Sequence, residues 1–221
     1  MCGRYSLAEP GKIAERFDAE PASGPLSASW NVAPGQSLPV ITRNSPNKVE
    51  VMRWGLIPSW AKDPKIGYKM INARGETVAE KNSFRSAFKS RRCLVPATGY
   101  YEWKREGLEK LPYFFRLKSA DLFSFAGLYE HWHNAEGNLL STYTVITTEP
   151  NRVAERVHDR MPVILPREAE ETWLSQDSTA DQLMGLLVPY PEEDMDAYQV
   201  SQQVNSPVNN GEALVAPLNS L

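Results

Sequence analysis

The stretch that decides the fold begins Arg92-Cys93-Leu94-Val95-Pro96, continues through Gly99-Tyr100-Tyr101-Glu102-Trp103-Lys104, and runs to residue 147. Apolar and aromatic residues occur in it as short runs, and turn-forming residues separate the runs. Such a pattern predicts successive antiparallel strands connected by hairpins. The predicted strands are residues 92–96, 99–104, 113–117, 123–132 and 139–147.

The rest of the chain adds further strands and short helices around this centre. We expect strands at residues 4–7, 38–42, 49–54, 163–165 and 198–204, a turn at Asn44-Ser45-Pro46-Asn47 and an ordered loop at 31–35. Apolar stripes predict helices at residues 10–17, 77–81, 83–90 and 150–157, followed by two acidic helices. The prediction is an α+β fold: a single domain over residues 1–221, mainly an antiparallel sheet with helices packed on it.

The composition is that of a globular protein of the cytoplasm. The chain has 221 residues, 42% of them hydrophobic and 23% charged, and no apolar run approaches the roughly 20 residues of a membrane span. The N-terminus does not resemble a signal peptide, and we expect no membrane partner. Two cysteines exclude a disulfide framework and fit a reducing compartment. Cys93 is predicted to be a small buried core residue.

Charge is unevenly distributed along the sequence. The net charge is −3, yet residues 167–198 hold nine acidic residues against one arginine and residues 199–221 add only Glu212. Residues 1–166 therefore carry a net charge of +6. A basic body of this kind fits an anion-binding groove. Acidic helices that merely keep the protein soluble would give the same distribution, so charge alone leaves both interpretations open.

Cys2 directly follows Met1, and this position gives it a special chemistry. If Met1 is removed, the mature chain begins with an α-amine and a thiol on adjacent carbons. Their reference pKa values are about 8 and about 8.5. An aldehyde condenses with such an amine to an imine, and the thiol then closes a five-membered thiazolidine at high effective molarity. The alternative is a chance cysteine on a frayed terminus.

Four further residues carry polar groups in unusual surroundings. Glu102 lies inside an aromatic strand, on the face of Tyr100, where burial would raise its pKa and suit proton transfer. His158 precedes a proline at an expected helix end and has the pKa range of a general acid or base. Asn72 and Arg74 lie at a strand-to-helix junction, where an amide can orient a nucleophile and a guanidinium can hold a phosphate.

Two tryptophans flank a glycine and a proline in residues 53–60, and lysines follow as far as Lys69. Core packing is the expectation for Trp54, whereas Trp60 is expected to be exposed at a loop tip, among the aromatic and basic groups that single-strand binders use. His131 and His133 share a strand face, but no cysteine pair has zinc-ligand spacing, so we expect no metal. No phosphate loop or dinucleotide motif is present, and we expect no cofactor.

Six short blocks of the sequence together resemble the signature of the SOS response-associated peptidase (SRAP) family. They occur in the family's order and are Cys2-Gly3-Arg4-Tyr5, Asn31-Val32-Ala33-Pro34, Arg53-Trp54-Gly55-Leu56-Ile57-Pro58, Ile71-Asn72-Ala73-Arg74-Gly75-Glu76-Thr77, Gly99-Tyr100-Tyr101-Glu102-Trp103 and His158-Asp159-Arg160-Met161-Pro162. The resemblance implies a central barrel-like antiparallel sheet with flanking helices. It also implies an enzyme of the DNA damage response that captures abasic sites in single-stranded DNA as a thiazolidine, forming a DNA–protein crosslink on damaged nucleoid DNA.

The resemblance also implies roles for individual residues. Cys2 would be the nucleophile, Asn72 would position its amine, and Glu102 and His158 would move protons. From the expected pKa values of the two groups, we assign the amine-side proton to Glu102 and the sugar-side proton to His158. Phosphates would be held by Arg4, Arg74 and Arg160, and the strand path would follow Asn31, Pro34 and Trp60. Ala61 departs from members that carry a second large aromatic there, which weakens the expectation of base stacking.

Two other functions remain open from the sequence. Cys2 with His158 as its base is the minimal dyad of a cysteine-type autoprotease or peptidase, which the family's name also suggests. A non-enzymatic single-strand binding module would use Trp60 and the arginines alone. In each case we expect the protein to act as a monomer.

Overall fold

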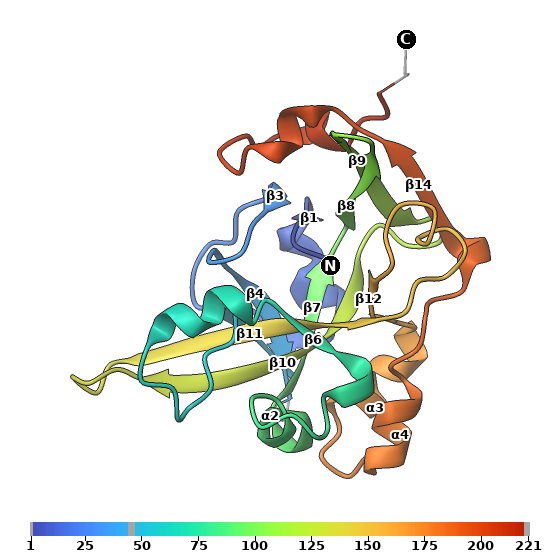
Figure 1. The fold of residues 1–221 in the computed structure, drawn as a ribbon. Helices are drawn as coiled ribbons and strands as arrows, with labels where there is room; N and C mark the ends of the chain where they lie inside the picture. Colours follow the sequence, from blue (N-terminus) through green and yellow to red (C-terminus); the bar gives the residue numbers. More distant parts are fainter. Residues whose placement is uncertain (1, 44–46, 219–221) are drawn as a thin grey trace.

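The fold is built on a closed barrel of five strands (Figure 1). The computed structural model describes residues 2–43 and 47–218. The strands pair in the order β11 (Leu139–Thr148), β10 (Phe123–His133), β7 (Arg92–Ala97), β4 (Ser37–Thr42) and β5 (Asn47–Trp54). β5 also pairs with β11 in parallel, through Arg53–Thr142 and Trp54–Tyr143, and this pairing closes the ring. Closure removes exposed sheet edges.

Four short strands extend the barrel sheet. β2 (Ala19–Glu20) pairs with β5, and β13 (Ile164–Leu165) pairs with β10. β6 (Asn72–Arg74) and β12 (Met161–Pro162) both pair with β11, in parallel and antiparallel orientation respectively. The segments around Asn72 and around Met161 are therefore both anchored on β11, although they lie far apart in the sequence.

A second sheet of five strands lies against the barrel. Its order is β14 (Met195–Gln199), β9 (Glu109–Leu117), β8 (Gly99–Glu106), β1 (Tyr5–Leu7) and β3 (Ser29–Val32). β1 is thus a central strand, paired with β8 through Tyr5–Tyr100 and with β3 through Tyr5–Val32. This pairing holds the start of the chain inside the fold.

Aromatic side chains join the two sheets in one core. The buried hydroxyl groups of Tyr5 and Tyr143 lie 2.7 Å apart, and Trp54 stacks on Tyr143 with ring planes 9° apart. At the start of β8, Gly99 leaves room for Phe114, because a Cβ there would lie 2.1 Å from the Cζ atom of that ring. A larger residue would therefore push β8 away from β9.

The helices are short and lie outside the barrel. The α-helices are α1 (Ile13–Arg16), α2 (Arg85–Ser90), α3 (Glu170–Leu174) and α4 (Ala180–Gly185). The 3₁₀ helices are η1 (Pro10–Lys12), η2 (Pro64–Lys69), η3 (Gly75–Thr77), η4 (Arg167–Ala169), η5 (Glu192–Asp194), η6 (Gln202–Asn205) and η7 (Glu212–Val215). Figure 1 shows α2, α3 and α4 together at one end of the molecule. Trp173 fixes α3 on the barrel, since its indole Nε1 donates to the Cys93 carbonyl at 3.0 Å.

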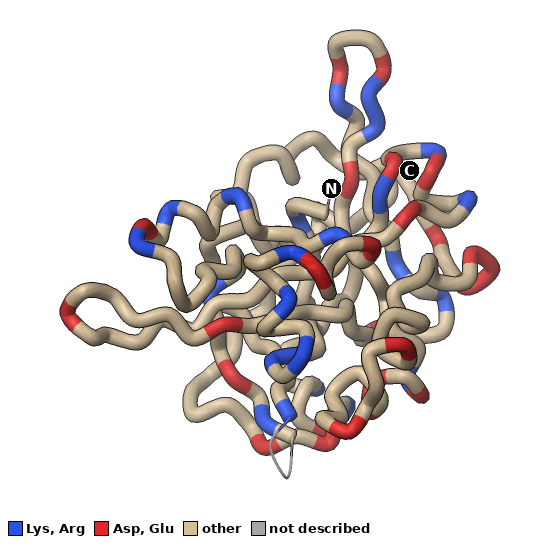
Figure 2. The backbone as a smooth tube through the Cα atoms, turned by 60° about the horizontal axis from the view of Figure 1, so that its bottom comes forward, with Lys and Arg blue, Asp and Glu red and all other residues tan. Residues whose placement is uncertain are grey.

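Two hairpins project from this body. The β10–β11 hairpin is the long arm at the left of Figure 1. The β8–β9 hairpin stands out at the top of Figure 2, where blue and red segments alternate on it because it carries lysine, arginine and glutamate residues. Its pairing runs from Tyr100–Phe115 to Glu106–Glu109.

The α+β class and the barrel-like antiparallel sheet are confirmed. The five predicted strands of residues 92–147 are all present, as are those at 4–7, 38–42 and 49–54, each with small shifts of its ends. Cys93 and Trp54 are core residues, and both cysteines are free thiols. The predicted turn at 44–47 lies mostly outside the described residues.

Four local predictions were wrong. The helix at 150–157 is a series of turns, in which the Asn151 side chain accepts from the Ala154 N–H and donates to the Tyr190 carbonyl. The helix at 77–81 shrinks to η3 and turns, and Asn31 and Val32 belong to β3, not to a loop. The last strand ends at Gln199, because residues up to 204 turn into η6.

Candidate active site

Cys2 is held in a buried position near Glu102. Its side chain is fully buried, its Sγ lies 3.8 Å from the Arg4 carbonyl oxygen, and its own carbonyl accepts a hydrogen bond of 2.8 Å from Nδ2 of Asn72. Because β1 follows between β8 and β3, the backbone has no freedom to fray. Cys2 therefore does not lie on a frayed terminus, and its role as the nucleophile stays a prediction. Asn72 fixes the peptide of the residue whose amine it was expected to position.

The side chain of Glu102, on β8, lies near Cys2. It is only 3% exposed, and burial raises the pKa of its carboxyl group to about 7. The pKa of the Cys2 thiol is raised mainly by burial and further by the Glu102 charge, so the two side chains interact electrostatically. Near neutral pH the carboxyl group of Glu102 can therefore either take up or give up a proton.

His158 reaches Glu102 from the turn that follows residue 157. Its Nε2 lies 4.0 Å from Oε2 of Glu102, and its Nδ1 accepts a hydrogen bond of 3.1 Å from the Arg160 backbone N–H. Burial lowers the pKa of His158, so the neutral imidazole predominates near pH 7. Nδ1 also lies beside the Asp159 carboxylate, and with the ring hydrogen on Nδ1 the lone pair of Nε2 faces Glu102 and can accept a proton. The exposed Asp159, with a carboxylate oxygen 2.9 Å from Nδ1, favours the protonated form.

Tyr100 forms part of the polar floor beneath these residues, and the sequence analysis did not single it out. It is 1% exposed, and its hydroxyl group has no hydrogen-bond partner among residues 2–43 and 47–218. Burial, then the charges of Cys2 and Glu102, raise the pKa of Tyr100 well above its usual value. The signal was present in the strand alternation, which places Tyr100 on the face of Glu102.

The three candidate phosphate-binding arginines differ in the partners that their guanidinium groups already have. Arg4 donates to Oδ1 of Asn31 at 2.7 Å and to the Val204 carbonyl at 2.9 Å, and its guanidinium lies 5.9 Å from the centre of the Trp103 ring. Arg160 is in a bidentate ion pair with Glu76, at 2.5 and 3.0 Å, and also donates to the Thr147 carbonyl.

Arg74 is exposed and forms no ion pair with another described residue. Its register partner on β11 is Thr147, the same residue that Arg160 contacts. The pKa of Glu76 is lowered most by the hydrogen bond from Arg160. The charges of Arg160 and Arg74 lower it further, by smaller amounts. Two cationic groups therefore converge on one point beside the cleft.

Of the three residues expected along the strand path, Trp60 lies as predicted. Its side chain is 60% exposed. It lines a hollow of about 290 Å³ together with Lys62, Lys65 and Lys69. Pro34 is partly exposed. Ala61, the departure from the family pattern, is 9% exposed and packs against Trp132, whose Nε1 donates to the Ala61 carbonyl at 2.7 Å.

Asn31 faces the protein interior, not the expected strand path. It is 2% exposed, and its Nδ2 donates to three backbone carbonyl groups of the C-terminal segment, those of Val204, Ser206 and Asn209. Its Oδ1 accepts from Arg4. Asn31 thus orients the Arg4 guanidinium, and its direct contact with a DNA strand stays a prediction.

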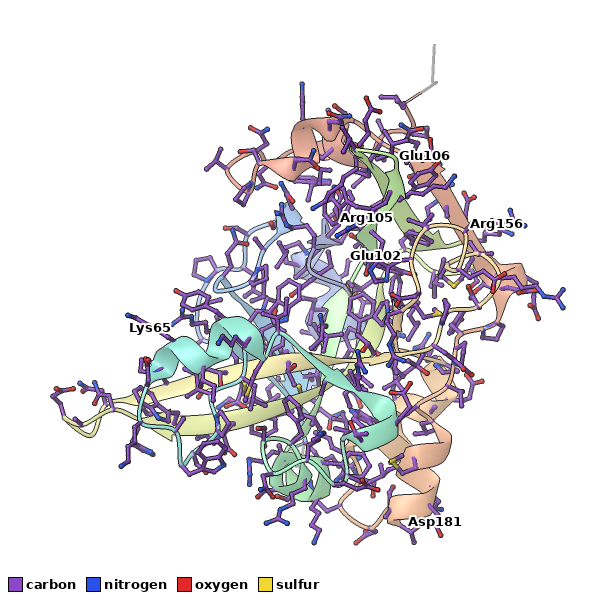
Figure 3. The ribbon with its side chains drawn as sticks, in the orientation of Figure 1. Lys65, Glu102, Arg105, Glu106, Arg156 and Asp181 are labelled. Carbon is purple, nitrogen blue, oxygen red and sulfur yellow. The ribbon has the colours of Figure 1, made fainter. Side chains whose placement is uncertain are left out.

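These residues surround a cleft of about 420 Å³. Its lining contains Arg4, Glu102 and His158, together with Trp103, Arg105, Lys110 and Asn205, which the sequence analysis missed. Figure 3 shows Glu102 and Arg105 close together on β8, with Asp181 of the acidic α4 at the opposite end of the molecule. A second hollow, of about 440 Å³, lies beside Arg16 and Glu170, whose charges are already paired at 2.9 Å.

Comparison with known proteins identifies the family. The family described as SOS response associated peptidase (SRAP) matches residues 1–207. The chain belongs to the SRAP family. Among its SRAP relatives, the abasic site processing protein YoqW of Bacillus subtilis is 52% identical over 221 residues, which cover 97% of this chain and 99% of YoqW. The abasic site processing protein HMCES of Mus musculus is 33% identical, with coverage of 100% of this chain and 77% of HMCES.

Solved structures show the same SRAP architecture. A crystal structure of a protein from Bacteroides thetaiotaomicron has a TM-score of 0.91 and 33% sequence identity, and covers 98% of this chain and 99% of its own. Within residues 2–43 and 47–218 of this SRAP chain, no three His, Cys, Asp or Glu side chains are grouped as metal ligands. No helix in the same residues has the length and apolar character needed to span a membrane.

Proposed function

We propose that this SRAP protein is an enzyme that captures abasic sites in single-stranded DNA covalently, through a thiazolidine formed by Cys2. The proposal requires removal of Met1, so that Cys2 has a free α-amine. Relatives at up to 52% identity are named abasic site processing proteins, which supports DNA that contains abasic sites as the substrate. The protein would act as a monomer on damaged nucleoid DNA in the cytoplasm.

One observation carries the proposal. The residue at position 2 is anchored by Asn72 in a cleft where a carboxyl group with a pKa of about 7 and a neutral imidazole face one another. An aminothiol needs both a base, to free its amine, and an acid, to activate the sugar. The cleft holds both at the only place on the chain where an aminothiol can arise.

The chemistry balances without a cofactor. Opening of the abasic deoxyribose breaks the C1′–O4′ bond, moves the C1′ hydroxyl proton away and delivers a proton to O4′, which gives an aldehyde. The Cys2 amine adds to this aldehyde, and loss of one water leaves an imine. The thiol then adds across the C=N bond: sulfur bonds to C1′, and the proton moves to nitrogen. The product is a thiazolidine that links the sugar to the chain.

The pKa shifts favour specific proton roles. Glu102 as a carboxylate takes a proton from the Cys2 ammonium, and its pKa of about 7 is close enough to that of the amine for efficient transfer. Once protonated, Glu102 can donate to O4′. His158 has a lowered pKa and is neutral, so it acts as the base for the C1′ hydroxyl group. Neutral His158 replaces the sugar-side acid expected from the sequence.

The DNA strand would lie along the arginines and the Trp60 hollow. Arg74 is available to bind a phosphate. Arg160 would bind a phosphate in competition with its ion pair to Glu76. The guanidinium of Arg4 is oriented by its hydrogen bond to Asn31. Three phosphate contacts predict that binding falls with salt with a log–log slope of about −2, at roughly −0.7 per contact for a single strand. Equal affinity for intact duplex would contradict this strand path.

A peptidase acting through Cys2 is less well supported. Such a mechanism needs a thiolate activated by a nearby imidazole. Burial, followed by the Glu102 charge, raises the pKa of the Cys2 thiol, and the Nε2 of His158 faces Glu102. This environment keeps the thiol protonated and so disfavours a thiolate nucleophile.

Mass spectrometry separates the candidate functions. The Met1-free protein is incubated with a single-stranded oligonucleotide that contains one abasic site. A covalent adduct with loss of one water is expected; a cleaved peptide would indicate proteolysis, and neither product would indicate plain binding.

Variants of Cys2 test the thiazolidine itself. Cys2→Ala keeps the amine, so an imine trapped by borohydride should persist while the heat-stable adduct disappears. Cys2→Ser keeps the size and tests whether sulfur is required. A heat-stable adduct formed by Cys2→Ala without reductant would disprove the thiazolidine.

A further inference from the structure

The β8–β9 hairpin presents two cations to the active-site cleft that no step of the proposed chemistry uses. Arg105 and Lys110 line the cleft together with Glu102 and His158, and both are exposed. The pairing of β8 with β1 covers only Gly99 and Tyr100. The cleft therefore follows the part of β8 that continues into the hairpin.

The two cations are direct cross-strand partners. Arg105 lies opposite Lys110 in the antiparallel register, and like charges placed directly opposite one another destabilise a hairpin. Neither forms an ion pair with a residue in the described ranges 2–43 and 47–218. The nearest carboxylate along the strand, that of Glu106, is held by Lys104 at 2.6 Å.

Charge on the hairpin is sorted by face. Because side chains alternate along a strand, Arg105 and Lys110 share the face of Trp103, and Glu106 and Glu109, also direct partners, share the opposite face with Glu102. The basic face therefore has no acid of its own to neutralise it. The cleft is reached from both faces, since its lining includes Trp103 and Glu102. The repulsion between Arg105 and Lys110 would be relieved if an anion from outside the hairpin bound between them.

Cationic residues from two segments far apart in the sequence lie near His158. The Arg160 backbone N–H binds Nδ1 of His158, and Arg74 pairs with Thr147, which Arg160 also contacts. Arg105 is near enough that its charge, after the larger effect of burial, lowers the pKa of His158. An abasic nucleotide within a strand has one phosphate on its 5′ side and one on its 3′ side. Two cationic walls match this arrangement.

We propose that Arg105 and Lys110 form a second phosphate-binding wall of the cleft, which holds the sugar–phosphate backbone on one side of the abasic nucleotide while Arg74 and Arg160 hold the other. This inference rests on the proposed function and adds the hairpin to the DNA-binding surface. Trp103, held by Asn205 at 2.7 Å and covered by Arg4, forms the floor between the two walls.

Equilibrium binding of a non-reactive DNA tests the wall. The probe is a labelled single-stranded oligonucleotide with a tetrahydrofuran abasic analogue, titrated by fluorescence anisotropy between 50 and 200 mM salt. For Arg105→Gln/Lys110→Gln in the full chain we expect about tenfold weaker binding at the low-salt end and a log–log salt slope smaller by roughly 1.4, for two lost contacts. The matched control is Arg85→Gln/Lys89→Gln, the same residue types exposed on α2, and it should leave the slope unchanged.

Oligonucleotides extended on only one side of the analogue locate the wall. The hairpin variant should lose affinity for one of the two, the 5′- or the 3′-extended form, and keep it for the other. An unchanged slope, an equal loss with both oligonucleotides, or an equal loss in the α2 control would overturn the proposal. The thermal midpoint should stay constant or rise, because the like-charge pair is removed; a lower midpoint would mean that the pair is structural.

A small aldehyde separates this inference from the proposed function. Reaction of the Met1-free wild-type protein with glycolaldehyde tests the Cys2 aminothiol alone, since no phosphate is involved. Failure of the wild-type protein to react would count against thiazolidine formation, while the binding result would still decide the hairpin.

Discussion

The Nε2 atom of His158 lies 4.0 Å from Oε2 of Glu102, although one residue comes from a turn and the other from a central strand. Burial acts on both, and in opposite directions on their pKa values: it raises that of Glu102 to about 7 and lowers that of His158. The carboxyl group thus titrates near neutral pH while the imidazole stays neutral. A proton can therefore pass through the pair without placing a charge on both groups.

Glu102 should make the protein less stable at alkaline pH. Its pKa is raised from 4.5 to about 7, so its stability contribution is complete below pH 4.5 and is lost as the pH rises through 7. The loss amounts to about 3 kcal/mol. Glu102→Gln lacks this titration, so its free energy of unfolding should exceed that of the wild type increasingly from pH 5 to pH 8.5 in urea denaturation. Glu109→Gln, at an exposed position, is the control. A difference that is constant with pH would argue against a buried carboxyl group.

His158→Ala should show whether the imidazole acts as a base. The pKa of His158 lies below its usual value because of burial. A neutral base is available above this pKa, so the ratio of wild-type to variant crosslinking rates should rise from about pH 5 and level off above about pH 7, the range around the reference imidazole pKa. Single-turnover rates measure it, and His133→Ala on the projecting β10–β11 hairpin is the control. A ratio that is largest at low pH would assign His158 the acid role.

Glu76 should compete with DNA for Arg160. The bidentate pair at 2.5 and 3.0 Å occupies the guanidinium, which lowers the pKa of Glu76. Glu76→Gln removes the competing charge, and single-stranded DNA should then bind about threefold more tightly, as expected for a partly exposed ion pair worth up to ~1 kcal/mol. Arg160→Gln should weaken binding, and the double variant should behave as Arg160→Gln alone. Additive effects in the double variant would show that Glu76 repels DNA independently.

Trp60 should contribute stacking without contributing stability. Because it is 60% exposed, Trp60→Ala should leave the thermal midpoint unchanged and weaken binding of single-stranded DNA by ~1–3 kcal/mol. Trp132→Phe keeps a ring but loses the bond to the Ala61 carbonyl, which should lower stability by about 1 kcal/mol and loosen the Trp60 loop. If Trp132 acts through Trp60, the double variant binds no worse than Trp60→Ala.

The sequence alone determined the class of fold and the chemistry of the key residue. Alternating apolar runs in residues 92–147 predict antiparallel strands because the side-chain period of a strand is local. The aminothiol at Cys2 is likewise a property of adjacent atoms. Strand alternation placed Glu102 on the face of Tyr100 but left open whether that face is buried, and the exposure of Trp60 followed from its loop.

Only the tertiary structure decided which groups meet and in which protonation state. The neutrality of His158, the burial of Asn31 and the pairing of Arg160 with Glu76 each depend on contacts between segments far apart in the chain. Desolvation and ion pairing are set by the whole surroundings of a group, and no local pattern encodes these surroundings. Only the folded chain shows that the basic face of the β8–β9 hairpin lines the same cleft as Glu102 and His158.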